Sequence, residues 1–183
     1  MADPAVAPDD AAEPAPDEPT EPTGPEPIHG APVTVALGET TIHPARGQLV
    51  EIVTALRDEG WLMCLDVTAV DHLTNSAPRL LPEGVAPERF EVVVMLISHQ
   101  RGERVRLKVQ VPEDDLVVPT LFEVHPGTEA LEREVFDMFG IRFDGHPDLT
   151  RILMPEDWIG HPLRKDYAVG RIPVQFKGDP GPR

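Results

Sequence analysis

The residues whose types could do chemistry gather between positions 132 and 167. Two Gly-His-Pro triplets place His146 and His161 in this segment, and Asp148 follows the first triplet closely. Imidazole and carboxylate groups bind metal ions, so a stand-alone metal-dependent enzyme using these three residues is one hypothesis. The wide separation of the two histidines does not match compact metal-binding motifs, and the proline after each one favours extended backbone. Hydrogen-bonding anchors at corners of the chain are therefore the preferred interpretation.

Carboxylate pairs, the cysteine and glycine-rich loops are the other candidates for chemistry. Glu132 and Glu134 lie two residues apart in an expected helix and point to different faces, so exposed charge or a salt bridge to a partner is expected of them. Cys64 is the single cysteine and lies in an apolar run, which is typical of a buried small hydrophobic residue. Phosphate-binding and nucleophile-elbow glycine motifs do not occur. The sequence therefore predicts no catalytic, cofactor-binding or metal-binding residue in this chain.

The remaining interpretation of this segment is recognition. Arginine guanidinium groups hold carboxylates bidentately, and aromatic side chains are frequent anchors of protein interfaces. We expect a surface made for a fixed partner, with internal bracing of the domain as the alternative. The residues predicted to make these contacts are Glu132, Arg133, Glu134, Asp137, Phe139, His146, Asp148, Arg151, Trp158, His161, Arg164, Lys165 and Asp166.

The elements that must position these groups follow an α+β pattern over residues 31–140. Apolar residues recur with helical spacing from about 43 to 59 and from 128 to 139, and a glycine follows each segment as a stop signal. Strands are predicted at 61–70, 90–97 and 104–111, together with a short edge strand within 33–42. Residues 112–119 are expected to form a turn-rich connection.

Beyond residue 140 the apolar residues are scattered among prolines and glycines. Such a segment is not expected to form a helix or sheet by itself, yet its aromatic and aliphatic content is too high for a free tail. Residues 141–183 are therefore predicted to be an extended arm that wraps a partner surface.

The predicted strand 104–111 places three cations on one face. Arg104, Arg106 and Lys108 alternate with valine and leucine, which point the other way. Two interpretations remain open for the cationic face: a solvated sheet surface, or a docking face for an acidic partner or tail.

Charge is distributed unevenly along the 183 residues, whose formal net charge is −16. Residues 1–27 hold eight Asp or Glu, eight Pro and no Lys or Arg, so residues 1–30 are predicted to be a disordered acidic tail. The tail acts either as a solvated spacer or as a contact arm. The rest of the chain is mildly acidic, which argues against nucleic acid as a partner. No apolar run could span a bilayer and no signal peptide is visible, so a cytosolic protein that reaches a membrane only through other proteins is expected.

Several motifs resemble those of the C subunit of NADH-quinone oxidoreductase, respiratory complex I. The resemblance covers roughly residues 44–176 and is most specific in its last third. One difference is Ala130, which stands where the family usually has tryptophan. The motifs are Glu132-Arg133-Glu134, Asp137-Met138-Phe139-Gly140-Ile141, Gly145-His146-Pro147-Asp148-Leu149, Arg151-Ile152-Leu153, Gly160 to Tyr167 and Ile172 to Phe176, with Asp66 to Asp71, Arg89 to Val93 and Arg104 to Val109 upstream.

The resemblance implies a two-layer α+β domain, with helices packed on a mixed β-sheet, followed by the extended C-terminal arm. It also implies a subunit without redox cofactors in the peripheral arm of a proton-translocating NADH-quinone oxidoreductase. Its main partner is then the quinone-site D subunit, with the B and I subunits as further neighbours. NADH, FMN, iron–sulfur clusters and quinone bind in neighbouring subunits, and the chain lies at the cytoplasmic side of the cell membrane. The alternative is the equivalent subunit of a ferredoxin-, deazaflavin- or hydrogenase-linked membrane complex.

Overall fold

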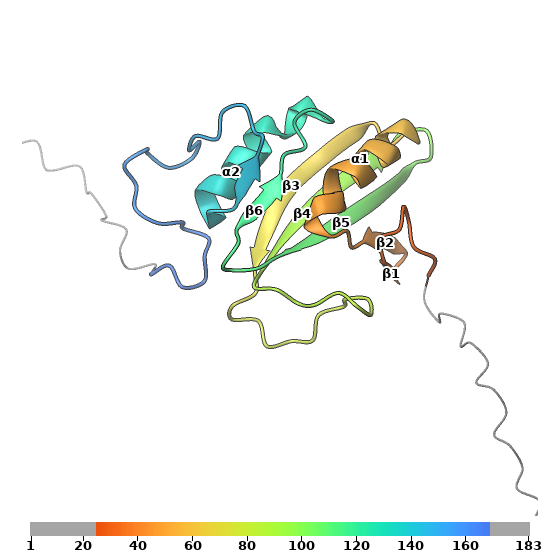
Figure 1. Cartoon of the computed structure of the whole chain (residues 1–183), viewed down its shortest axis with the longest axis horizontal. Helices are drawn as coiled ribbons and strands as arrows, with labels where there is room; N and C mark the ends of the chain where they lie inside the picture. Colours follow the sequence, from red (N-terminus) through yellow and green to blue (C-terminus); the bar gives the residue numbers. More distant parts are fainter. Residues whose placement is uncertain (1–24, 169–183) are drawn as a thin grey trace, which may run out of the picture.

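The computed structural model describes residues 25–168 and has two layers, a mixed β-sheet and the helices that cover one of its faces (Figure 1). The five-stranded sheet has the order β1-β2-β5-β4-β3, with β2 parallel to β5 and every other pair antiparallel. This confirms the α+β prediction. In chain order the elements are β1 (Val33–Ala36), β2 (Glu39–Ile42), η1 (Arg46–Gln48), α1 (Leu49–Asp58), β3 (Met63–Asp71), β4 (Phe90–Ser98), β5 (Glu103–Val111), β6 (Val117–Pro119), η2 (Pro126–Thr128), α2 (Glu129–Phe139) and β7 (Arg142–Asp144).

The core lies between the sheet and the helices. Alternate residues of β4, from Phe90 to Leu96, are completely buried, and the valines and leucine of β5 between Val105 and Val111 pack beside them. Helix α1 adds a stripe with helical spacing that includes Ile52, Val53 and Leu56. The other face of the sheet, called here the open face, carries no helix. The residues between these positions on β4 and β5 are therefore only partly buried, with the exception of Glu91, which is 2% exposed.

Two features of the sheets differ from the sequence prediction. Residues 33–42 form two strands instead of one, because Leu37 and Gly38 both have positive φ and close a tight turn between β1 and β2. A separate parallel pair joins β6 to β7, in segments predicted to contain no strand. Strands of three residues are too short to show a periodicity in the sequence. The two strands of this pair also lie more than twenty residues apart in the chain.

Helix α2 ends as predicted, since Gly140 adopts the left-handed conformation with φ 78°. At its start Thr128 is the N-cap residue, but its side chain makes no capping bond, and its hydroxyl donates to the Glu132 carboxylate at 3.0 Å. None of the helices between residues 25 and 168 has the length and apolar character that crossing a membrane requires.

Candidate partner-binding site on the C-terminal arm

Asp137 of α2 holds the beginning of the arm from a completely buried position. One carboxylate oxygen accepts a hydrogen bond from Arg151 Nη1 at 2.6 Å. The other accepts three successive backbone N–H groups, those of Ile152, Leu153 and Met154, at 3.1, 2.8 and 2.8 Å. Burial opposes ionisation here, yet the N–H of Met154 and the Arg151 guanidinium outweigh it and lower the pKa of Asp137. The irregular backbone of residues 152–154 is thereby held against helix α2.

Carbonyl groups at the end of α2 hold the next part of the arm. His161 Nδ1 donates to the Asp137 carbonyl at 3.0 Å, and Arg164 Nε donates to the Phe139 carbonyl at 2.6 Å. A Cβ atom on Gly140 would lie 2.6 Å from His161 Nε2, so only glycine allows this approach. Burial lowers the pKa of His161, which favours the neutral form of the ring in this hydrogen bond. Arg164, which was expected to hold a carboxylate, binds a carbonyl oxygen here.

The outer side of α2 contacts the arm through Arg133 and His146. Arg133 donates to the carbonyl of Thr150 at 3.1 Å, to the Thr150 hydroxyl at 2.9 Å and to the Arg151 carbonyl at 3.2 Å. His146 Nε2 donates to the Glu129 carbonyl at 3.1 Å, while its Nδ1 accepts the N–H of Asp148 at 3.1 Å. Both rings of the Gly-His-Pro triplets are therefore anchors at corners.

A second carboxylate, Asp71 at the end of β3, holds the far end of the described arm. Its oxygens accept the backbone N–H of Lys165 at 2.8 Å and two hydrogen bonds from Arg89, at 3.2 and 3.0 Å. Arg89 also forms an ion pair with Asp166 at 2.9 Å and one with Glu113. Burial works against the charge, but the Arg89 hydrogen bonds bring the pKa of Asp71 down to about 2. The arm is thus held at both ends by carboxylates of its own domain.

Glu132 does not take part in this arrangement, and the expectation that it is exposed or paired with a partner is wrong. Its side chain is completely buried on the other side of α2. The carboxylate accepts the hydroxyls of Thr120 and Thr128 and the N–H of Leu121 at 2.8 Å. Burial raises the pKa of Glu132, and within residues 25–168 no cation is paired with it. It therefore fixes the segment before α2, as Asp137 fixes the segment after it.

Four aliphatic side chains of the arm are exposed, among exposed charged residues such as Glu156 and Asp157. Ile152, Leu153, Ile159 and Leu163 are 40%, 60%, 90% and 47% exposed, and they stand on backbone that α2 holds in place. Trp158 is half-buried, and its indole N–H is covered but has no acceptor within the described residues. Exposed aliphatic side chains on a backbone fixed by hydrogen bonds are suited to a protein interface. We call these four residues the arm surface.

Hydrogen bonds and ion pairs are the contacts that these groups make. Within residues 25–168 no group of three or more His, Cys, Asp and Glu side chains is arranged to hold a metal ion, so His146, Asp148 and His161 do not form the metal site considered from the sequence. Cys64 is half-buried, and burial raises the pKa of its thiol to about 11, which is unfavourable for a nucleophile.

Comparison with known proteins decides the family. The model of the family "Respiratory-chain NADH dehydrogenase, 30 Kd subunit" matches residues 42–172. The chain belongs to this family.

Two relatives of this member of the 30 Kd subunit family are C subunits of NADH-quinone oxidoreductase. The C subunit of NADH-quinone oxidoreductase from Saccharopolyspora erythraea is 47% identical over 149 residues, which are 80% of this chain and 56% of the relative. The C subunit from Mycolicibacterium gilvum is 45% identical over 149 residues, 80% of this chain and 62% of the relative. The chain therefore spans about three fifths of the length of these relatives.

Solved structures support the same fold for the 30 Kd subunit. A trypsin-resistant fragment of Nqo5 is 35% identical, with a TM-score of 0.58, and the match covers 66% of this chain and 91% of the fragment. A chain in the membrane-bound sulfane sulfur reductase, an archaeal respiratory membrane complex, matches with a TM-score of 0.57. This match covers 84% of the present chain and 90% of the reductase chain. At 22% identity this second likeness shows the fold alone.

In this 30 Kd subunit the structure brings most of the predicted contact residues together around the end of α2 and the arm. Glu134, Asp148 and Lys165 are exposed, and the side chains of Glu134 and Lys165 make no polar contact within residues 25–168. The contact residues that sequence reasoning missed include Asp71 and Arg89. Both lie in upstream motifs of the family resemblance, but no local pattern indicated that they meet the arm.

Proposed function

We propose that this chain is the C-type subunit of a proton-translocating NADH-quinone oxidoreductase, with a structural and assembly role and no redox group of its own. The whole complex would be the enzyme, a translocase that transfers electrons from NADH to quinone. NADH, FMN, iron–sulfur clusters and quinone would bind in neighbouring subunits. Because electron transfer depends on the spacing of cofactors, a rigid clamp between redox subunits affects its rate without carrying an electron.

The observation that carries this proposal is the arm surface. The family membership supports the assignment to this complex. The arm offers a contact region whose backbone is already fixed before a partner binds. Aliphatic side chains that are largely exposed and held at fixed positions lose little conformational freedom on binding, which favours affinity. We assign the arm surface to the quinone-site D subunit as main partner, with the B and I subunits as further neighbours. Residues 141–183 would then form the partner-wrapping arm, of which the structure describes residues 141–168.

The proposed location follows from the complex. A chain of this kind would lie at the cytoplasmic side of the cell membrane as a peripheral protein, held there by other subunits. We therefore expect the chain to sediment with membranes that contain the complex, and to leave them where the D subunit is missing.

Affinity purification from membranes tests the proposal. The tagged full-length chain would be expressed in the native host, recovered from detergent-solubilised membranes, and its bound proteins identified by mass spectrometry. We expect the D subunit in stoichiometric amount together with the NADH-oxidising module and NADH-quinone activity. Recovery with a ferredoxin-, deazaflavin- or hydrogenase-linked module would assign the chain to a related complex instead. Recovery of the chain alone would refute the proposed role.

A further inference from the structure

The open face of the sheet carries a positively charged region in a chain that is otherwise strongly acidic. Arg104, Arg106 and Lys108 alternate along β5 with the buried Val105, Leu107 and Val109, so they lie on the face away from the helices, as the sequence pattern predicted. Their neighbours on β4, including Val93 and Met95, are partly buried aliphatic side chains. We call the three β5 cations the basic row.

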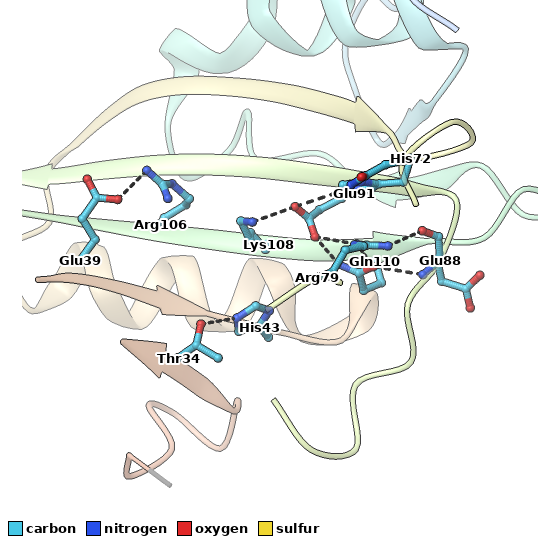
Figure 2. Close-up of polar contacts among 11 residues, drawn as sticks. Thr34, Glu39, His43, His72, Arg79, Glu88, Glu91, Arg106, Lys108 and Gln110 are labelled. Atoms are coloured by element: carbon cyan, nitrogen blue, oxygen red, sulfur yellow. Dashed lines mark hydrogen bonds and ion pairs between the residues drawn. The ribbon is translucent and has the colours of Figure 1, made fainter. Parts of the chain in front are cut away.

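Carboxylates of the folded domain neutralise the basic row only in part (Figure 2). Lys108 is 3.1 Å from Glu91, whose buried carboxylate also accepts hydrogen bonds from Arg79 at 2.8 Å and Gln110 at 2.6 Å. Arg106 pairs with Glu39 at 2.8 Å, but the side chain of Glu39 is 60% exposed. The exposed Arg104 forms no ion pair within residues 25–168. Four cations, counting Arg79, therefore face the carboxylates of Glu39 and Glu91, and the exposed Asp66 of β3 is a third carboxylate on this face.

A hollow of about 140 Å³ opens beside the row. Arg106 and Lys108 line it together with Glu39, the partner of Arg106, and with Thr34, Ala36, Leu37, Thr41 and Leu80. Leu37 and Leu80 are 104% and 62% exposed, so the hollow has aliphatic walls next to its cations. This combination fits an extended acidic segment that also contains small apolar residues.

The chain itself supplies such a segment. Residues 1–24 hold seven of the 32 acidic residues and none of the 16 basic ones, with alanine, valine and proline between the charges. The described chain begins at Pro25, and the hydrogen-bonded turn from Ile28 to Ala31 leads directly into β1. β1 pairs with β2, and β2 pairs with β5, so the tail enters the fold two strands from the basic row.

We propose that the acidic N-terminal segment, residues 1–24, docks on the basic row of the open face. Two strand spacings are about 10 Å, whereas 24 residues can extend to about 80 Å, so the connection reaches easily. Tethering gives the segment an effective concentration in the millimolar range without any second molecule. The arm cations are a less favourable target, because the arm is anchored at β3, on the opposite edge of the sheet, and Arg133, Arg151 and Arg164 already bind carbonyl or carboxylate oxygens.

Amide chemical shifts of the full-length chain test this docking. In one variant the seven acidic residues of the segment become their amides, for example Asp9→Asn and Glu13→Gln, and residues 25–183 stay unchanged. We expect shift differences from the wild type at Thr41, Arg104, Arg106 and Lys108. The differences should vanish at about 1 M salt, where the Debye length is ~3 Å. No difference at the basic row, or differences confined to the arm, would overturn the proposal.

A matched pair of variants separates docking from a general charge effect. Arg104→Gln with Arg106→Gln should abolish the tail-dependent shifts at Thr41 and Lys108. Arg57→Gln removes an exposed cation from α1, on the other face of the sheet, and should leave these shifts intact. Equal loss in both variants contradicts docking, as does a dependence of the shifts on protein concentration, which would assign the basic row to a second copy. Both measurements use the isolated chain and are independent of the membrane purification that tests the proposed function.

Discussion

Asp137 is the residue on which the position of the arm depends. Its buried carboxylate receives four hydrogen bonds, one from Arg151 and three from the backbone of residues 152–154. Successive N–H groups that point at one anion require a specific backbone conformation, so a single side chain determines the course of several residues.

Replacing this carboxylate should loosen the arm. Asp137→Asn keeps the shape but removes the charge that pairs with Arg151, and we expect the free energy of unfolding to fall by about 2–4 kcal/mol. Urea unfolding measures the loss, and hydrogen exchange of the amides of residues 152–154 should accelerate. Glu134→Gln, an exposed position on the same helix, is the control and should change stability by less than about 0.5 kcal/mol. An equal effect of both substitutions would contradict this role of Asp137.

Asp71 should make the free energy of unfolding depend on pH in the acidic range. The pKa of its carboxyl is about 2 in the folded chain against an ordinary value of 3.8, so the folded state binds the proton less readily. The stabilisation is then complete above pH ~4 and is lost as the pH falls toward 2, by about 2 kcal/mol. Unfolding experiments between pH 5 and pH 2 should show the gap between wild type and Asp71→Asn shrinking by that amount. A gap that stays constant with pH would refute it.

Helix α2 connects the segments on both of its sides. Apolar residues such as Val135 and Met138 pack it on the sheet, while two buried carboxylates on the same helix bind the chain before it and after it. Glu132 holds the segment at Thr120 and Leu121, and Asp137 holds the arm. A helix of eleven residues thus fixes two irregular segments, the one before it and the arm after it, which have no repeating backbone hydrogen bonds of their own.

The end of α2 provides a test at the level of this element. Gly140→Ala adds a Cβ at φ 78°, which costs about 1–2 kcal/mol by itself, and places it 2.6 Å from His161 Nε2. Gly84→Ala is the matched control, because its φ is 83° and nothing lies within 4 Å of the added atom. We expect Gly140→Ala to destabilise the fold by at least about 1 kcal/mol more than the control, as measured in urea, and to expose the arm to proteolysis. Equal losses of stability in the two variants would show that His161 of the arm does not lie close to Gly140.

The whole molecule presents two surfaces of different character. The arm surface is aliphatic and rigidly supported, whereas the open face combines aliphatic residues with the basic row. The arm is fixed at β3, at one edge of the five-stranded sheet, whereas the basic row lies on β5, the central strand, on the face that carries no helix. One molecule can therefore use the first surface for assembly while the second remains available to its own tail.

Assembly should depend on the arm surface and not on exposed apolar residues in general. Ile159→Ser changes a side chain that is 90% exposed, so fold stability should stay within about 0.5 kcal/mol, while the recovery of the D subunit on the tagged chain should drop several-fold. Leu37→Ser, at a position 104% exposed in the β1–β2 turn, should leave recovery unchanged. Quantitative mass spectrometry of the purified material compares the two variants. Full recovery with Ile159→Ser would remove this residue from the interface.

Local patterns were sufficient for much of the fold. Alternation along 104–111 predicted both faces of β5, helical spacing predicted α1 and α2, and Gly140 marked the end of α2 correctly. These signals are local because the periods of strands and helices repeat within a few residues. The motifs after residue 131 likewise identified the family, which the family model confirms.

The sequence by itself determined the class of the fold, the positions of its main elements and the family. Only the tertiary structure decided what each polar residue does. Glu132 and Glu134 look equivalent in the sequence, yet one is completely buried and the other exposed. The pairing of β6 with β7 and the contact of Asp71 with Lys165 join segments that are distant along the chain. A charged side chain is buried only where hydrogen-bond donors from other parts of the chain contact it, and the local periodicity of the sequence does not indicate which donors these are.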